Sequence, residues 1–127
     1  MTAAEVVDAF LAAVGRGDLP AMRELLADDV ALRIPAKSSL AGSYAGRDAV
    51  LAAVAELDRI LAAYDSDLYA RFDSDNRVDL IYLDRGPAGS ADASRRACSY
   101  GVVGGRIAEI DVFQGYADTP AGASLQQ

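Results

Sequence analysis

The stretch between residues 28 and 48 constrains the fold more than any other part of this 127-residue chain. Val30–Ile34 is predicted to form a short β-strand that stops at Pro35, because proline cannot extend a central ladder and biases the residue before it to extended geometry. Gly46 and Asp48 then open a long helix, where a negative charge suits the positive end of the helix dipole. Helical segments precede this strand and further strands follow the helix. That order predicts a sheet curled around helices, with a pocket between them.

Two more helices are predicted ahead of the first strand. Thr2 and Glu5 have the spacing of a capping box, in which each side chain satisfies a backbone N–H at the helix start. The apolar residues that follow recur at helical spacing, at Val6, Val7, Phe10, Leu11 and Val14. Asp18 is a good N-cap for a second, short helix with Pro20 in its first turn. The longest helix is predicted from Arg47 to about Tyr64.

Strands account for most of the second half of the chain. The segments predicted as strands are Leu68–Phe72, Arg77–Asp84, Ser94–Val103 and Arg106–Phe113. Gly104 and Gly105 are a strong signal for a tight hairpin between the last two. Loops are predicted around residues 36–45, 65–67 and 85–93, and a loosely held tail from about residue 117. We therefore expect residues 1–127 to form one α+β domain.

Composition excludes several classes of function. A formal net charge of −7 and a pI near 4.4 argue against nucleic acid or an anionic membrane as a partner. No apolar run reaches the length of a membrane span, so a cytoplasmic location is expected. The chain has no histidine and one cysteine, Cys98, which excludes Ser-His-Asp and Cys-His catalysis and His-ligated metal. We expect no cofactor, and acid–base work by carboxylates, Arg, Tyr or Cys.

Four phrases of the sequence resemble the NTF2-like superfamily. They are Gly17-Asp18-Leu19, Leu26-Ala27-Asp28-Asp29-Val30, Gly42-x-x-x-Gly46-Arg47-Asp48-Ala49-Val50 and Gly105-Arg106-Ile107-Ala108-Glu109. The resemblance implies a cone in which three N-terminal helices pack on a curved, mostly antiparallel sheet and enclose a pocket. It is strongest to the SnoaL-like bacterial branch with polyketide cyclases, ketosteroid isomerase and limonene epoxide hydrolase. Function differs so widely within this superfamily that it must be argued from the site.

The isomerase and cyclase patterns map poorly onto this sequence. The catalytic Tyr, Asp base and Asp acid of ketosteroid isomerase fall on Phe10, Ile34 and about Ala97, none of which can do that chemistry. An isomerase of that type is therefore not expected. The acidic base of the related polyketide cyclases falls near Gly115, so that Asp111 or Asp118 would have to replace it.

The limonene epoxide hydrolase pattern fits better. Its Arg-x-Asp and Asp-x-Phe groups resemble Arg77-Val78-Asp79 and Asp111-Val112-Phe113, the second after a gap of one residue. The resemblance implies that Asp111 takes a proton from water, Arg77 bridges both carboxylates and Asp79 protonates the epoxide oxygen. An Arg between two carboxylates in an apolar pocket can hold one charged while the other keeps its proton. The family's water-placing Tyr and Asn fall on Ala31 and Arg33.

Six further residues are candidates for substrate binding, namely Arg33, Tyr100, Arg96, Phe10, Tyr64 and Phe113. Each also has a structural interpretation that stays open at this point. Charges on strands are commonly solvated, so that Arg33, Arg77 and Asp79 have an alternative as surface groups. The aromatic side chains have an alternative as core, and Cys98 as a small core residue.

The sequence therefore predicts a small-molecule enzyme that uses cofactor-free acid–base catalysis on a hydrophobic metabolite in natural product biosynthesis. Epoxide opening and polyketide-type cyclisation are the two expected reactions. The alternative is a non-catalytic ligand-binding or accessory protein of the same fold. In either case we expect a small hydrophobic ligand, no nucleic acid or membrane partner, and a homodimer.

Overall fold

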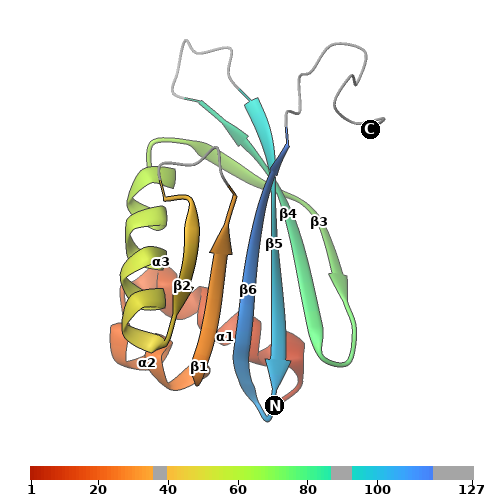
Figure 1. Ribbon diagram of the computed structural model, residues 1–127. Helices are drawn as coiled ribbons and strands as arrows, with labels where there is room; N and C mark the ends of the chain where they lie inside the picture. The colour runs from red at the N-terminus through yellow and green to blue at the C-terminus, as the bar shows by residue number, and fades with distance from the viewer. Residues whose placement is uncertain (36–39, 87–92, 116–127) are drawn as a thin grey trace.

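The computed structural model describes residues 1–35, 40–86 and 93–115 of the chain. Figure 1 shows a twisted sheet with helices packed against one of its faces. The helices are α1 (Ala3–Arg16), α2 (Leu19–Leu25) and α3 (Arg47–Leu61). The strands are β1 (Leu26–Ile34), β2 (Gly42–Ala45), β3 (Asp65–Asp73), β4 (Arg77–Arg85), β5 (Ala93–Val103) and β6 (Arg106–Gly115). The predicted tail and most of the predicted 85–93 loop lie outside the described residues.

The six strands form one sheet in the order β2-β1-β6-β5-β4-β3. Every neighbouring pair is antiparallel except β1 and β6, which run parallel. This confirms the α+β class and the mostly antiparallel sheet. No helix within the described residues is long and apolar enough to cross a membrane.

The helix ends follow the capping signals of the sequence. Thr2 and Glu5 form the reciprocal capping box, with Glu5 N donating to Thr2 Oγ1 over 3.1 Å. Gly17 ends α1 in the left-handed region, at φ 67°, where glycine carries no Cβ penalty. The Asp18 side chain accepts from Ala21 N at the start of α2. Helix α3 stops at Leu61, three residues before the predicted end at Tyr64.

Two loops predicted from the sequence are partly or wholly strand. Residues 42–45 form β2, which pairs with β1 and places Tyr44 opposite Leu32. The segment 65–67, predicted as a turn, is the start of β3 and pairs with the end of β4. Both segments are short and rich in Gly, Ser or Asp, so their strand conformation comes from pairing with a neighbour and not from local propensity.

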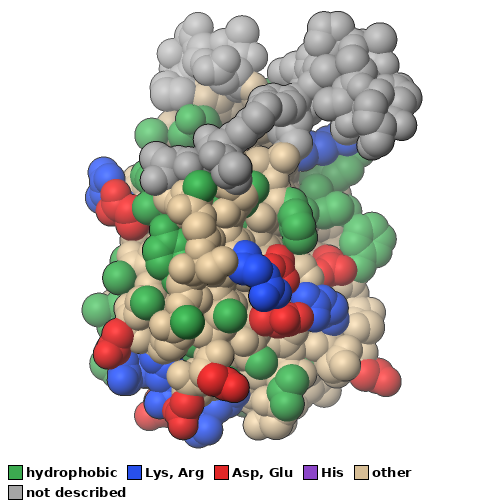
Figure 2. All heavy atoms as spheres, viewed as in Figure 1, with side chains coloured by type: hydrophobic (Ala, Val, Ile, Leu, Met, Phe, Trp, Pro, Cys, Tyr) green, Lys and Arg blue, Asp and Glu red, His purple; other side chains and the backbone are tan. Residues whose placement is uncertain are grey.

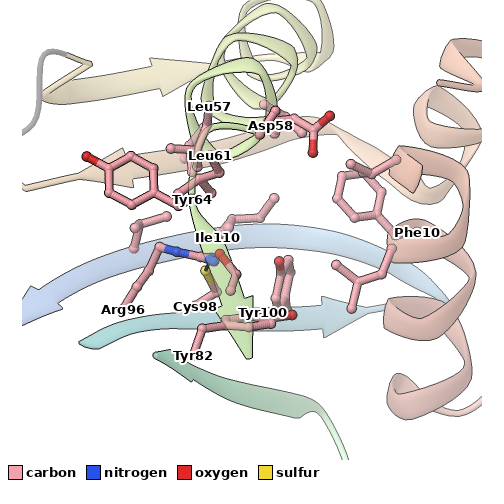
Figure 3. Close-up of a pocket in the computed structure, with 17 residues that line it drawn as sticks. Phe10, Leu57, Asp58, Leu61, Tyr64, Tyr82, Arg96, Cys98, Tyr100 and Ile110 are labelled. Carbon is pink, nitrogen blue, oxygen red and sulfur yellow. Dashed lines mark hydrogen bonds between the residues drawn. The ribbon is translucent and has the colours of Figure 1, made fainter. Parts of the chain in front are cut away.

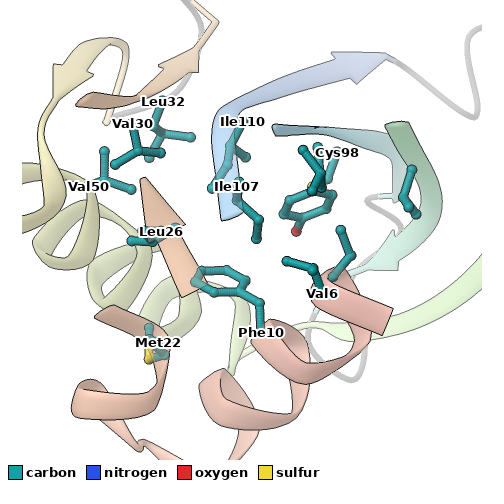
Figure 4. Packing of buried hydrophobic residues seen from close by; sticks show 14 of the residues in the cluster. Val6, Phe10, Met22, Leu26, Val30, Leu32, Val50, Cys98, Ile107 and Ile110 are labelled. Atoms are coloured by element: carbon teal, nitrogen blue, oxygen red, sulfur yellow. The ribbon is translucent and has the colours of Figure 1, made fainter. Parts of the chain in front are cut away.

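The two faces of the sheet differ sharply. The helix-covered face carries the core, with fully buried side chains such as Val30, Leu32 and Ile107 (Figure 4). Each large aliphatic side chain buried there stabilises the fold by about 1.5–3 kcal/mol. The opposite face, called the open face below, carries the alternate residues of the same strands. Gly104 and Gly105 close the predicted β5–β6 hairpin with φ of 61° and 79°.

Candidate functional site

A cavity of about 420 Å³ lies between α1, α3 and the helix-covered face of the sheet (Figure 3). This volume falls within the range of roughly 300–1,000 Å³ that small-molecule sites occupy. Its wall is mostly apolar, and the lining side chains come from Phe10, Leu11, Val14, Leu32, Val54, Leu57, Asp58, Leu61, Ala62, Tyr64, Ser66, Tyr82, Arg96, Cys98, Tyr100, Ile110 and Val112. The pocket predicted from the element order is therefore present.

One ion pair is buried at the sheet side of this cavity. Arg96 on β5 is 7% exposed and Asp84 on β4 is 2% exposed. Arg96 Nε donates to Asp84 Oδ2 over 2.8 Å and Nη2 donates to Oδ1 over 3.1 Å, a side-on bidentate pair. Ser66 Oγ, from β3, donates to Asp84 Oδ1 over 2.6 Å. The carboxylate of Asp84 thus accepts hydrogen bonds from two different strands.

The guanidinium of Arg96 stays charged in this setting. Burial is the largest single influence and alone would lower its pKa, but the hydrogen bonds and charge attraction of its neighbours, chiefly Asp84, together outweigh burial and raise the pKa above its ordinary value. The guanidinium carbon lies 4.4 Å from the centroid of the Tyr82 ring, which adds a cation–π contact. Arg96 Nη1 also donates to Cys98 Sγ over 3.3 Å. Arg96 is therefore a fixed positive group in an apolar wall.

The other buried polar groups in the wall are neutral. Burial raises the pKa of the Cys98 thiol, although the neighbouring Arg96 acts in the opposite direction. Burial likewise raises the pKa of the Tyr100 hydroxyl well above its ordinary value, and that of Tyr82 to a smaller extent. At neutral pH these residues keep their protons, so they act as hydrogen-bond donors and not as bases.

The helix side of the cavity carries a different kind of polar group. Asp58 on α3 is exposed and belongs to the cavity lining. Figure 3 shows Asp58 and Leu61 on the helix above the cavity, and Arg96, Cys98 and Tyr100 on the sheet below it. A molecule in the cavity would therefore have a guanidinium on its sheet side and a carboxylate near the mouth.

Two of the predicted catalytic residues, Arg77 and Asp111, come together, but on the open face. Register places Arg33 of β1 beside Asp111 of β6, and Asp111 beside Ser99 of β5. Arg33 Nη2 donates to Asp111 Oδ2 over 3.0 Å, and Arg77 Nη2 lies 3.6 Å from the same oxygen. Glu109 joins them, because Arg77 Nη1 donates to its Oε1 over 2.6 Å. Figure 2 shows these opposite charges gathered at the centre of that face.

The expectation that Asp111, Asp79 and Arg77 line the pocket is therefore wrong. Side chains alternate between the two faces along a strand, and these three belong to the face opposite the cavity. Asp79 Oδ1 is buried there and has no hydrogen-bond partner among the described residues. The catalytic role given to the three residues stays a prediction that their position in the fold does not favour.

The six predicted substrate-binding residues divide between the two faces. Arg96, Tyr100, Phe10 and Tyr64 line the cavity. Arg33 and Phe113 do not line it, and their substrate-binding role stays a prediction. Arg33 pairs with Asp111 on the open face, and Phe113, also on that face, is 57% exposed. Their strand positions share the odd-numbered face with Asp111, whereas the cavity takes the even-numbered residues of β1 and β6.

Comparisons with known proteins place the chain in a family. The model of the SnoaL-like domain matches residues 7–110. The chain belongs to the SnoaL-like domain family. An uncharacterized protein of Mycobacterium tuberculosis is 32% identical over an alignment 127 residues long. The alignment covers 95% of this chain and 93% of that protein.

Solved structures agree with the family's NTF2-like fold. An NTF2-like protein from Burkholderia xenovorans superposes with a TM-score of 0.72 at 21% identity, over 100% of this chain and 98% of that one. A putative polyketide cyclase from Sinorhizobium meliloti superposes with a TM-score of 0.66 at 17% identity, over 86% and 94%. At these identities the likeness shows the fold alone.

The key residue of this SnoaL-like site that sequence reasoning missed is Asp84. The alternation of side chains along β4 could have revealed it, because Asp84 continues the face that carries Val78, Leu80 and Tyr82. An acid that continues a buried apolar face requires a buried partner. Among the described residues, no group of three or more His, Cys, Asp or Glu side chains could hold a metal ion.

Proposed function

We propose that this SnoaL-like protein binds a small hydrophobic molecule in the cavity and catalyses cofactor-free acid–base chemistry on it, of the polyketide-cyclisation type. The observation that carries the proposal is the buried guanidinium of Arg96 in a mostly apolar wall. Arginine has five N–H donors, and the described residues Asp84 and Cys98 take up three of them. Two are left for an oxygen of the bound molecule.

The wall supplies the two groups that an intramolecular aldol reaction needs. Loss of a proton next to a ketone leaves an enolate, and a fixed cation such as Arg96 stabilises the negative charge that develops on its oxygen. Asp58, the carboxylate among the described lining residues, accepts that proton. The enolate carbon then attacks a second carbonyl of the same molecule, a C–C bond forms, and the proton returns from Asp58 to the new alkoxide.

The geometry favours cyclisation over epoxide opening. Epoxide opening as inferred from the sequence requires two carboxylates bridged by an Arg within the pocket. The residues predicted to form that arrangement, Arg77, Asp79 and Asp111, lie on the open face, where Arg77 contacts Asp111. In the cavity wall the Arg96 guanidinium is paired with Asp84, which is fully engaged by Arg96 and Ser66.

Turnover of an aryl-substituted 1,5-diketone, whose intramolecular aldol closure gives a six-membered ring, tests the proposal. We expect the protein to accelerate closure over buffer, as followed by chromatography. Asp58→Asn should lower kcat by about 10²-fold or more while binding changes little, as for loss of a general base. Asp29→Asn, which removes an exposed carboxylate away from the cavity, is the matched control.

Binding without turnover is the second candidate function. The exposure of Asp58 favours it, because water around an exposed carboxylate weakens its electrostatic interaction with a bound molecule. The same experiment separates the two. A diketone that binds in the cavity and is recovered unchanged at the buffer rate would overturn the catalytic proposal and leave the binding function.

A further inference from the structure

Resting on the proposed cavity function, we propose that Asp84 makes the cavity selective for neutral, carbonyl-bearing ligands and against carboxylates of the same shape. Asp84 does not belong to the cavity lining itself. It acts through Arg96, which makes it a specificity-determining residue held one step behind the wall.

The charges of the two buried ionic side chains beside the cavity cancel. Arg96 contributes one positive charge and Asp84 one negative charge, and both are more than nine-tenths buried. The thiol of Cys98 and the hydroxyl of Tyr100 are neutral at pH 7. The buried polar end of the cavity therefore has hydrogen-bond donors among its lining residues but carries no net charge.

A ketone and a carboxylate would differ in how they interact with Arg96 at this end of the cavity. A ketone oxygen can accept from the remaining N–H groups of Arg96 without bringing a charge into the wall. A carboxylate would bring an additional negative charge beside a guanidinium that Asp84 already neutralises, unlike an enolate, whose charge is transferred from Asp58 when that side chain takes up the proton. Transfer of an uncompensated anion out of water is costly, and the nearby Asp84 carboxylate adds repulsion.

The Asp84 carboxylate is held in place and cannot move away to admit an anion. Its two oxygens accept from Arg96 at 2.8 and 3.1 Å and from Ser66 at 2.6 Å. In the β4–β5 ladder Tyr82 pairs with Arg96, and in the β3–β4 ladder Ser66 pairs with Asp84. The three strands thus fix the carboxylate against the guanidinium, and the charge balance is part of the fold.

The test compares two probes of nearly equal shape, 2-acetonaphthone and 2-naphthoate, the second fully ionised at about pH 7.5. Dissociation constants are measured by titration for the wild type, for Asp84→Asn and for Asp111→Asn. Asp111→Asn is the matched control, because it removes a carboxylate that also pairs with arginine but lies on the open face. Leu57→Trp, which fills the cavity, shows where the probes bind, with Ala52→Trp on the exposed side of α3 as its control.

We expect the wild type and Asp111→Asn to bind the ketone at least about tenfold more tightly than the carboxylate. In Asp84→Asn the guanidinium is uncompensated, and the preference should reverse. Wild-type protein that binds 2-naphthoate as well as or better than the ketone would overturn the inference and leave the cavity function intact. That outcome overturns the inference even where Asp84→Asn fails to fold. If neither probe binds, or if binding survives Leu57→Trp, the cavity function itself falls.

Discussion

The two faces of the sheet hold the same kinds of charged residue in opposite surroundings. On the helix-covered face, Arg96 and Asp84 have side chains that are 8% and 3% exposed. On the open face, the ionic cluster of Arg33, Arg77, Glu109 and Asp111 has side chains that are 15% to 51% exposed. Exposure to solvent, and not residue type or spacing, makes the difference between an ion pair buried beside the cavity and one that is screened by water.

The largest effect that this comparison predicts is on stability. Arg96→Met leaves the Asp84 carboxylate buried without its partner, and removal of one member of a buried pair typically costs about 3–5 kcal/mol. The double variant Arg96→Met with Asp84→Leu removes both charges and should recover most of that loss. Urea denaturation of the single and double variants measures both. A double variant as unstable as the single one would show that packing, and not the unpaired charge, causes the loss.

The same kind of change on the open face should matter far less. Arg77→Met breaks the contacts of Arg77 with Glu109 and Asp111, but Arg33 still pairs with both carboxylates. Half-exposed ion pairs contribute about 1 kcal/mol or less. The loss in urea denaturation should shrink further in about 1 M salt, where charges are screened over a few ångströms. A cost equal to that of Arg96→Met would contradict the comparison.

Acid should weaken the open-face cluster in a definite pH window. The hydrogen bond from Arg77 lowers the pKa of Glu109, and that from Arg33 lowers the pKa of Asp111. Because the folded-state values lie below the unfolded ones, which are near 4, the unfolded chain binds more protons in between. The stabilisation is present above about pH 4 and is lost as pH falls through the folded-state values.

Glu109→Gln combined with Asp111→Asn should therefore flatten the loss of stability below about pH 4, as followed by urea denaturation at a series of pH values. The control is Glu24→Gln with Asp29→Asn, which removes two exposed carboxylates outside the cluster. Equal flattening in both double variants would mean that the cluster has no special part in acid stability.

Much of the fold follows from local signals in the sequence. The capping box of Thr2 and Glu5, the Asp18 cap and the Gly104-Gly105 hairpin depend on a few neighbouring residues, and all are present in the structure. The strand β2 and the first residues of β3 were missed, because they are ordered by partners distant in sequence. Long-range pairing leaves little trace in local propensity.

The site was predicted in part, and the part that failed has a clear cause. Period-two alternation groups residues of a strand into two sets, but it does not say which set faces the helices. Apolar residues settle that choice for β4, where Val78 and Leu80 are buried. A face that mixes apolar and charged residues is harder to assign, because on β4 the apolar Ile81 and Leu83 share the open face with Arg77 and Asp79. Arg77 and Asp111 of the predicted catalytic group are therefore in contact, but on the face away from the cavity.

The smallest expected effect is the sharpest test of that reassignment. Asp79→Asn and Asp111→Asn, each made separately, should leave both the affinity for 2-acetonaphthone and the rate of diketone closure unchanged, because both carboxylates lie across the sheet from the cavity. The catalytic role inferred from sequence requires instead that each substitution abolish turnover in a folded protein. Loss of activity with unchanged circular dichroism would return the reaction to the open face, where Asp79 Oδ1, which has no hydrogen-bond partner in the described part of the chain, would then be the atom to follow.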